Sequence, residues 1–115
     1  MKPTEPSAIA SSFETGALPR VSCGIFVKNE AQHLKRCIDS LLAQNYPPIE
    51  ICISDNSSTD GSVDVLRKFA AVNDCIQLNL NTEDVGQAVN ARKVLEMASG
   101  EYFFFVGADD YYDPN

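Results

Sequence analysis

The length, composition and charge of this chain describe one globular domain. Its 115 residues are 44% hydrophobic and 22% charged, which is ordinary for a folded protein and excludes a disordered or fibrous one. Nine Lys and Arg stand against sixteen Asp and Glu, giving a formal charge of −7, so we expect no nucleic-acid partner. An anionic ligand would need a cation, helix N-termini or a few basic groups to offset this acidic excess.

The sequence shows no targeting pattern. No apolar run approaches the roughly 18 to 20 residues that span a bilayer, and the start of the chain lacks the apolar stretch of a secretory signal. We predict a flexible leader over 1–19, one domain over 20–115, and a cytoplasmic protein whose membrane association, if any, comes from parts outside this chain. The cysteines form no C-x-x-C pair and lie among apolar residues, which predicts buried free thiols at Cys23, Cys37, Cys52 and Cys75.

From Val21 onwards, strand and helix patterns alternate. The run VSCGIFV predicts a first strand. We expect Asn29 to cap the helix that follows, with Gln32 making the reciprocal capping-box contact, and the residues 45–48 (NYPP) to end it. One face of this helix is apolar at helical spacing and holds Leu34, Cys37, Ile38, Leu41 and Leu42.

The cycle then repeats. The run IEICIS predicts a second strand, and Ser58, Thr59 or Asp60 is expected to cap the next helix. That helix has a shared apolar face of Val63, Leu66, Phe69 and Ala70. The run CIQLNL alternates apolar and polar residues, which is typical of a strand with one buried face or near a sheet edge.

The last two elements are a helix and a strongly apolar strand. The helix is predicted from about Gly86 to Ala98, and Ser99-Gly100 stops it. The run over 102–106 is uninterrupted and apolar, which suits a strand covered on both faces. The residues of the helix that we expect to point inward are Ala88, Ala91, Leu95 and Ala98.

This alternation of strands and helices predicts both a fold and the location of a site. It implies a Rossmann-like α/β domain, with a parallel sheet of about four strands, right-handed crossovers and helices on both faces. Ligands bind such sheets beyond the carboxyl ends of the strands, where the strand order reverses. The residues at those ends are 28–30 (KNE), 55–58 (DNSS) and 107–110 (GADD).

Two adjacent carboxylates follow the fourth predicted strand. Asp109 and Asp110 carry like charges, which are unfavourable at this spacing unless a cation or hydrogen-bond donors compensate. Their oxygens suit Mg²⁺ or Mn²⁺, which binds one or two carboxylates together with substrate phosphates. The alternative is a solvated acidic turn, but the position at a strand end favours a metal-bridged diphosphate.

Other candidate residues lie at or near the same edge. Asp55 ends the second strand and can accept hydrogen bonds from a base N–H or ribose hydroxyls. Glu30 lies in the first turn of a helix, where the helix dipole alone favours it. Gly86 can open a phosphate-binding helix N-terminus or simply form a turn, and Arg92 can reach a phosphate or simply lie exposed.

Several motifs occur together here in a fixed order. They are N-E after the first strand, S-L-L-A-Q-x-Y-P, D-N-S-S-T-D-G-S, A-S-G-E-Y and D-D-x-x-x-P. In this order, from Val21 to the last residue, the chain closely resembles the N-terminal nucleotide-binding half of family 2 glycosyltransferases with the GT-A fold. It differs from the common pattern by Gly107-Ala108-Asp109-Asp110 in place of D-x-D-D, and by Asn90-Ala91-Arg92 in place of A-R-N.

The resemblance implies an inverting, metal-assisted transfer of sugar from a nucleoside diphosphate sugar, usually a UDP-sugar, to a sugar, lipid or protein acceptor. Asp55 would contact the base, and Asp109 and Asp110 would hold the ribose and a Mn²⁺ or Mg²⁺ ion, which acts as a Lewis acid. The acceptor half and the general base are expected beyond Asn115. The predicted nucleotide-sugar site comprises Val27, Asn29, Glu30, Asp55, Asn56, Gly86, Arg92 and Asp109, with Asp109 and Asp110 as metal ligands.

Two other classes of protein compete with this interpretation. The first is a non-catalytic nucleotide-binding or interaction module that uses the same pocket. The second is a phosphoacceptor receiver-like domain, which is disfavoured because its acidic cluster follows the first strand, where this chain has 28–30 (KNE). If the fourth strand belongs inside a larger sheet, its Phe103-Phe104-Phe105 run has an uncovered edge or face here, and we expect self-association or marginal stability.

Overall fold

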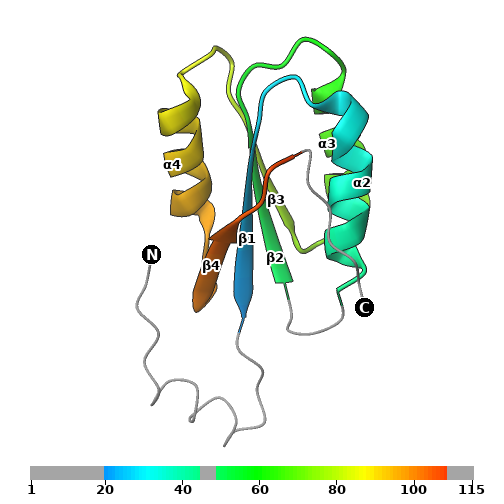
Figure 1. Ribbon diagram of the computed structural model, residues 1–115, viewed down its shortest axis with the longest axis vertical. Coiled ribbons are helices and arrows are strands. Elements are labelled where there is room, and N and C mark those ends of the chain that lie inside the picture. Colours follow the sequence, from blue (N-terminus) through cyan, green and yellow to red (C-terminus); the bar gives the residue numbers. More distant parts are fainter. Residues whose placement is uncertain (1–19, 45–48, 109–115) are drawn as a thin grey trace, which may run out of the picture.

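The protein folds as a parallel sheet with helices on both faces (Figure 1). A computed structural model describes residues 20–44 and 49–108. The predicted leader, the predicted helix end at 45–48 and the two carboxylates Asp109 and Asp110 lie outside these residues. The described sheet has four strands in the order β3-β2-β1-β4, namely β1 (Val21–Val27), β2 (Ile49–Asp55), β3 (Ile76–Leu80) and β4 (Tyr102–Phe105).

Three helices cover the two faces of this sheet. Helices α2 (Ala31–Leu42) and α3 (Ser62–Val72) lie together on one face, and α4 (Gln87–Met97) lies on the other (Figure 1). All strand pairs are parallel. The strand order reverses at β1, because the chain adds β2 and β3 on one side of it and β4 on the other. No helix within the described ranges is long and apolar enough to cross a membrane.

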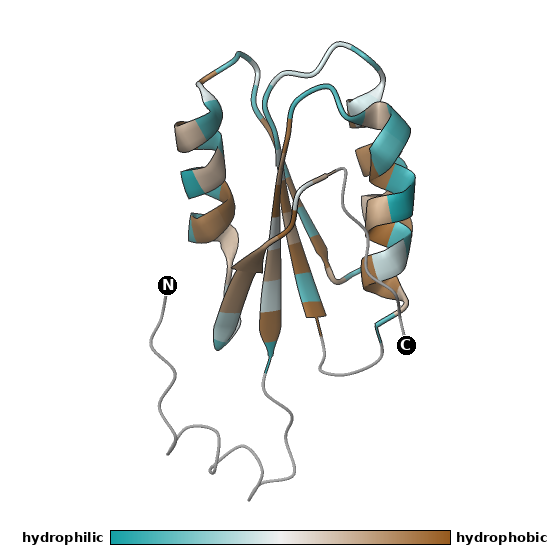
Figure 2. Cartoon of the chain, viewed as in Figure 1, coloured by the Kyte–Doolittle hydropathy of each residue, from teal (hydrophilic) through white to brown (hydrophobic). Residues whose placement is uncertain are grey.

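The main hydrophobic core lies between the sheet and the pair α2 and α3. Alternate residues of β1, from Cys23 to Val27, point into it, and so do Ile51 and Ile53 of β2. Apolar stripes on these helices face the sheet, while their outer surfaces are polar (Figure 2). The predicted inner face of α2 is confirmed, with complete burial of Leu34, Cys37 and Ile38 and 2% exposure of Leu41.

The inward face of α4 differs from the prediction. Its buried residues are Asn90 and Val94, whereas Leu95 is 38% exposed and Ala88 is exposed. Val94 packs where β1 has Gly24: a Cβ atom at this glycine would lie 2.6 Å from Val94 Cγ1. The sequence pattern failed because the helix buries an asparagine, which periodicity in apolar residues does not detect.

The two outer strands of the described sheet behave differently. β3 lies at an edge of the described sheet, one of the two positions predicted for it; Ile76 is buried, Gln77 is exposed, and the other three residues are partly exposed. The prediction that β4 is covered on both faces is wrong, because Phe105 is 44% exposed. Its ring packs edge-on against Phe26, at a centroid distance of 5.6 Å, and against Phe103, at 4.8 Å.

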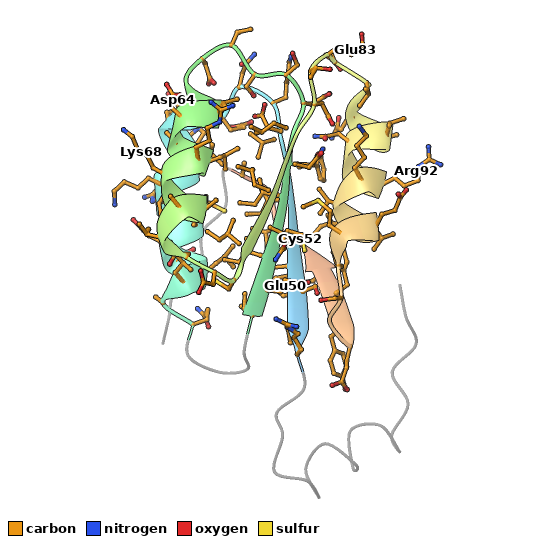
Figure 3. The ribbon with its side chains drawn as sticks, turned by 180° about the vertical axis from the view of Figure 1, so that it is seen from behind. Glu50, Cys52, Asp64, Lys68, Glu83 and Arg92 are labelled. Carbon is orange, nitrogen blue, oxygen red and sulfur yellow. The ribbon has the colours of Figure 1, made fainter. Side chains whose placement is uncertain are left out.

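A buried carboxylate on β2 joins β1 and the α4–β4 connection at the amino end of the sheet. Glu50 lies beside Cys52 (Figure 3) and is 5% exposed. Its Oε1 accepts hydrogen bonds from the Ser22 hydroxyl and the Ser99 N–H, both at 2.9 Å, and its Oε2 accepts one from the Ser99 hydroxyl at 2.8 Å. Gly100 N–H donates to Ser22 Oγ at 2.8 Å, so the Ser-Gly pair that ends α4 ties that helix to the sheet.

The prediction of buried free thiols is confirmed for three of the four cysteines. All four thiols are free, with Cys23, Cys37 and Cys52 buried and Cys75 partly exposed. Burial raises the pKa of Cys23 to about 12, so this thiol is protonated and unreactive at neutral pH.

Candidate functional site

A cleft of about 360 Å³ opens at the carboxyl ends of β1 and β2, on the α4 side of the sheet. This is the edge where the strand order reverses at β1 and where the sequence predicted a pocket. Of the predicted site residues, the structure brings Val27, Glu30, Asn56 and Gly86 to the cleft. The complete lining is Phe26, Val27, Lys28, Glu30, Asn56, Asp84, Gly86, Gln87 and Asn90.

Two loops on one side of the cleft are bound to each other, and we call them the loop clasp: residues 28–31 after β1 and residues 55–62 after β2. The first backbone N–H groups at the start of α2 donate to side chains of the second loop. Asn29 N–H donates to Ser58 Oγ at 2.8 Å, Glu30 N–H to Ser62 Oγ at 3.0 Å and Ala31 N–H to Asp60 Oδ2 at 3.1 Å. The D-N-S-S-T-D-G-S motif therefore caps a helix that lies elsewhere in the sequence.

The local capping predictions are corrected by this arrangement. Glu30 occupies the cap position of α2 and makes no side-chain cap hydrogen bond. Asn29 instead has a left-handed backbone, with φ of 53°, and its Oδ1 accepts the Thr59 N–H at 2.7 Å. Helix α3 starts later than predicted, because its cap residue is Gly61. Asp60 Oδ1 still accepts the N–H of Ser62 at 3.0 Å.

Asp55 is fully buried and belongs to the turn of the second loop. Its Oδ2 accepts the Ser58 N–H at 2.9 Å and its Oδ1 accepts the Ser58 hydroxyl at 2.6 Å. The neighbouring Ser57 has a left-handed φ of 61°, which costs a non-glycine residue energy and is compensated by such contacts. Asp55 does not line the cleft, so its predicted contact with a base stays a prediction.

The other side of the cleft is formed by the β3–α4 connection, which Asn56 holds in place. Asn56 Oδ1 accepts the Val85 N–H at 2.9 Å, and its Nδ2 donates to Asp84 Oδ1 at 2.8 Å. The same Asp84 oxygen accepts the Gly86 N–H at 2.8 Å. The Gly86 N–H, followed by Asn56 and the charge of Lys28, lowers the pKa of Asp84, so this carboxylate is ionised at neutral pH.

Lys28 bridges the two sides of the cleft. Its Nζ donates to the backbone oxygens of Asn56 at 3.0 Å and Ser57 at 2.9 Å, and lies 3.7 Å from Asp84 Oδ2. Sequence reasoning named this residue only as part of a strand end. A lysine at such a position looks like an ordinary solvated side chain, and only the fold shows that its ammonium turns back into the cleft.

Asn90 forms the floor of the cleft and was also missed. Its Nδ2 donates to the Ser54 backbone oxygen at 2.9 Å, and its Oδ1 accepts the Ser54 hydroxyl at 2.6 Å and Asn81 Nδ2 at 2.9 Å. Each polar atom of this 2% exposed side chain is thus satisfied. The sequence offered no signal for it, because Asn90 lies outside the predicted apolar face of this helix.

Arg92 and Asn29 do not line the cleft. Arg92 projects from the outer surface of α4 (Figure 3), with its Nε 4.0 Å from Glu96 Oε1. Asn29 lies within the loop clasp. Among the described residues the cleft contains one cation, Lys28, against the carboxylates Glu30 and Asp84.

The predicted metal ligands cannot be placed. Asp109 and Asp110 lie outside the described residues, and within those residues no group of three or more His, Cys, Asp or Glu side chains could hold a metal ion. The described chain leaves the sheet after β4: Val106 N–H donates to Gly24 O at 2.9 Å, and Ala108 is buried at 6% exposure in the core beside α2.

The fold is a parallel α/β sheet covered by helices on both faces, with a cleft at the carboxyl ends of β1 and β2. The family model of glycosyl transferase family 2 matches residues 22–115, and the chain belongs to that family. Glycosyltransferase AglE of Haloferax volcanii is 31% identical over 97 residues, which is 83% of this chain and 32% of the relative. The putative teichuronic acid biosynthesis glycosyltransferase TuaG of Bacillus subtilis is 34% identical over 82 residues, 71% of this chain and 32% of the relative.

Solved structures confirm the fold prediction. Mannosyltransferase PcManGT from Pyrobaculum calidifontis, solved in complex with GDP-Man and Mn²⁺, has a TM-score of 0.75 at 29% identity, covering 83% of this chain and 29% of that one. S. aureus TarS 1-349 in complex with UDP has a TM-score of 0.74 at 22% identity over the same shares, a likeness in fold. This chain thus spans less than a third of these relatives.

Proposed function

We propose that this chain is the donor-binding part of a glycosyltransferase that transfers a sugar from a nucleoside diphosphate sugar, foremost a UDP-sugar, to a sugar, lipid or protein acceptor, with inversion and metal assistance. The observation that carries the proposal is the cleft at the carboxyl ends of β1 and β2, in a chain of glycosyl transferase family 2. PcManGT, which shares this fold, was solved with a nucleotide sugar.

Specific residues receive roles in this proposal. Val27 at the end of β1, together with Glu30, would line the nucleoside pocket. Asn56 would hold the β3–α4 connection in place at the side of this pocket. Gly86, with φ of 88° and ψ of 153°, places the start of α4 at the cleft. The polar atoms at this edge are held by the loop clasp and by Asn56 before any ligand arrives, and such preorganisation lowers the entropy cost of binding.

The charge of the cleft supports a divalent cation. Two carboxylates against one ammonium, within the described lining, repel a diphosphate unless a cation neutralises it. Asp109 and Asp110 supply the hard oxygen atoms that Mg²⁺ and Mn²⁺ prefer, and they follow directly after Ala108 in the chain. When bound, such an ion would stabilise the charge on the departing nucleoside diphosphate.

Thermal stabilisation by nucleotides tests the proposal. We expect UDP with Mn²⁺ to raise the melting temperature of the chain, because a ligand that binds only the folded state stabilises it. The Asp109→Ala variant should lose most of this increase in melting temperature. The control variant Asp64→Ala removes an exposed carboxylate of α3, away from the cleft, and should keep the increase.

Two outcomes separate the alternatives. If no nucleoside diphosphate shifts the melting temperature at millimolar concentration, donor binding is refuted. If nucleotides bind and the chain also hydrolyses or transfers a donor sugar, the alternative of a non-catalytic nucleotide-binding module is refuted.

A further inference from the structure

Asn81 lies next to the cleft and uses every hydrogen-bonding position of its side chain. It follows the end of β3, is partly buried, and does not line the cleft. Its Oδ1 accepts hydrogen bonds from Asn79 Nδ2 and Lys93 Nζ, both at 2.9 Å. Its Nδ2 donates to Asn90 Oδ1 at 2.9 Å and to Asn56 Oδ1 at 3.3 Å. An asparagine side chain offers two donors and two acceptor positions, so this amide is completely satisfied.

Two of these partners, Asn56 and Asn90, shape the cleft. Asn56 holds the β3–α4 connection through the Val85 N–H and Asp84, and Asn90 forms the floor. They come from different elements, one from the loop after β2 and the other from α4. Because Asn81 hydrogen-bonds to both, it ties one wall of the cleft to its floor.

The position of Asn81 itself is fixed by the sheet. Its backbone N–H donates to the Asp55 carbonyl oxygen at 2.9 Å, which continues the pairing of β2 with β3 by one residue. On β3, Asn79 Nδ2 donates both to Asn81 Oδ1 and to Ser54 Oγ, the latter at 2.8 Å. The side chain of Asn81 therefore starts from a backbone that cannot shift without breaking the edge of the sheet.

Two charged groups set the direction of the amides next to the cleft. The Lys93 ammonium has only donors, so it faces the oxygen of Asn81 and leaves Asn81 Nδ2 for the two asparagines. At the other end the Asp84 carboxylate accepts from Asn56 Nδ2 at 2.8 Å, so Asn56 Oδ1 faces Asn81 and the Val85 N–H. A series of hydrogen bonds thus runs in one direction from an ammonium to a carboxylate, and the charges at its ends polarise the bonds between them.

We infer that Asn81 is a positioning residue for donor binding, which holds Asn56 and Asn90 in their binding arrangement from outside the lining of the cleft. The inference rests on the proposed function and adds Asn81, with Lys93 behind it, to the residues on which binding depends. Neither was predicted from the sequence motifs, and neither lines the cleft. A wall and a floor that are already ordered lower the cost of binding, because the ligand does not have to order them.

Amide hydrogen exchange in the chain without ligand tests the positioning of the wall. In Asn81→Leu, which has no polar side-chain atom, we expect the Val85 N–H to exchange at least about fivefold faster, the factor that corresponds to one hydrogen bond of ordinary strength. Asn81→Asp should act in the same direction, because it keeps the oxygen atoms and loses both donors. The matched control is Asn73→Leu, which removes an amide that donates to the Phe69 carbonyl oxygen at 2.9 Å, at the end of α3 and away from the cleft.

Isothermal titration calorimetry with Mn²⁺ and UDP, or GDP where UDP does not bind, tests the effect on binding. Measured well below the melting temperature of each variant, Asn81→Leu should weaken binding at least about fivefold, and Asn73→Leu should leave it unchanged. Asn81→Ser is a second variant, whose side chain is too short to reach Asn56, and it should weaken binding in the same way. Both variants of Asn81 are uncharged, so weaker binding cannot come from added repulsion of a diphosphate.

The outcomes distinguish this inference from the proposed function. Unchanged exchange of the Val85 N–H in the Asn81 variants overturns the inference alone. A lower melting temperature with an unchanged affinity for the nucleotide also overturns it, because Asn81 would then only stabilise the fold. If the unmodified chain binds no nucleoside diphosphate, the proposed function is refuted and the role of Asn81 in donor binding with it, whereas the exchange of the Val85 N–H still decides whether Asn81 holds the wall.

Discussion

Among single residues, Glu50 shows how a buried charge is stabilised in this fold. Burial on its own would raise its pKa, but hydrogen bonds from the Ser99 N–H and hydroxyl and from Ser22 lower the pKa below its ordinary value. A carboxyl group whose pKa is lower in the folded state binds fewer protons there than when unfolded. Its contribution to stability is therefore complete above the unfolded pKa and is lost as pH falls through the folded pKa.

Replacing Glu50 tests this contribution. At neutral pH we expect Glu50→Gln to lower the free energy of unfolding by about 2 kcal/mol, because an amide weakens the charge-assisted hydrogen bonds from Ser99 and Ser22. The difference between the two proteins should shrink as pH falls below about 4.3, the usual pKa of a glutamate in an unfolded chain. Urea unfolding curves over a range of pH measure this. If the difference in the free energy of unfolding does not depend on pH, the shape of the Glu50 side chain and not its charge positions Ser99.

The sequence located single polar residues well where a strand end marks them, and poorly elsewhere. Glu30 and Asn56, which line the cleft, follow from the ends of two predicted strands. Asn90 and Asp84 do not, because their importance depends on Ser54 and Lys28, which lie far from them in the chain. Hydrophobic periodicity finds buried apolar residues, and a buried amide remains hidden from it.

At the level of elements, the start of α2 depends on another loop. Its N–H groups are satisfied by Ser58, Asp60 and Ser62, whereas local rules predicted Asn29 and Gln32. Capping rules consider only neighbours in sequence, so they identified the start of the helix but not the partners that satisfy it. The strands and the two helices on the α2 face were predicted because their periodicity is strong.

Removing the Asp60 carboxylate tests capping across the two loops. We expect Asp60→Ala to lower the free energy of unfolding by about 1 kcal/mol, as for the loss of an N-cap. Amide hydrogen exchange in the first turn of α2 should accelerate as well, because Ala31 N–H loses its acceptor. Asp74→Ala, which removes an exposed carboxylate after α3, serves as the control. Faster exchange confined to the start of α3 would contradict capping of α2.

For the whole molecule, the outer strand β4 is the most exposed apolar feature of the described sheet. Its free edge has no strand partner within the described residues, and Phe105 is 44% exposed beside Phe26 and Phe103. An exposed apolar strand edge is a site of association between copies. The sequence predicted the apolar run and, for a strand that belongs inside a larger sheet, an uncovered edge or face. Which residue is exposed depends on the strands that lie next to β4.

Self-association through β4 should be measurable. We expect the chain to sediment as a concentration-dependent mixture of species in analytical ultracentrifugation, and Phe105→Ser to shift it toward monomer. Val72→Ser is a matched control, because Val72 is 79% exposed on α3, on the opposite face of the sheet from the Phe105 ring. A monodisperse monomer at every concentration would show that the edge of β4 is protected.

The loop clasp has a consequence for protein engineering. Residues 28–31 and 55–62 share at least five hydrogen bonds from one loop to the other, from Lys28, Asn29, Glu30 and Ala31. A graft that moves only one of these loops into another scaffold leaves helix N–H groups and the Lys28 ammonium without partners. The two loops should therefore be transferred together into another scaffold, and variants with an altered ligand preference should exchange both loops.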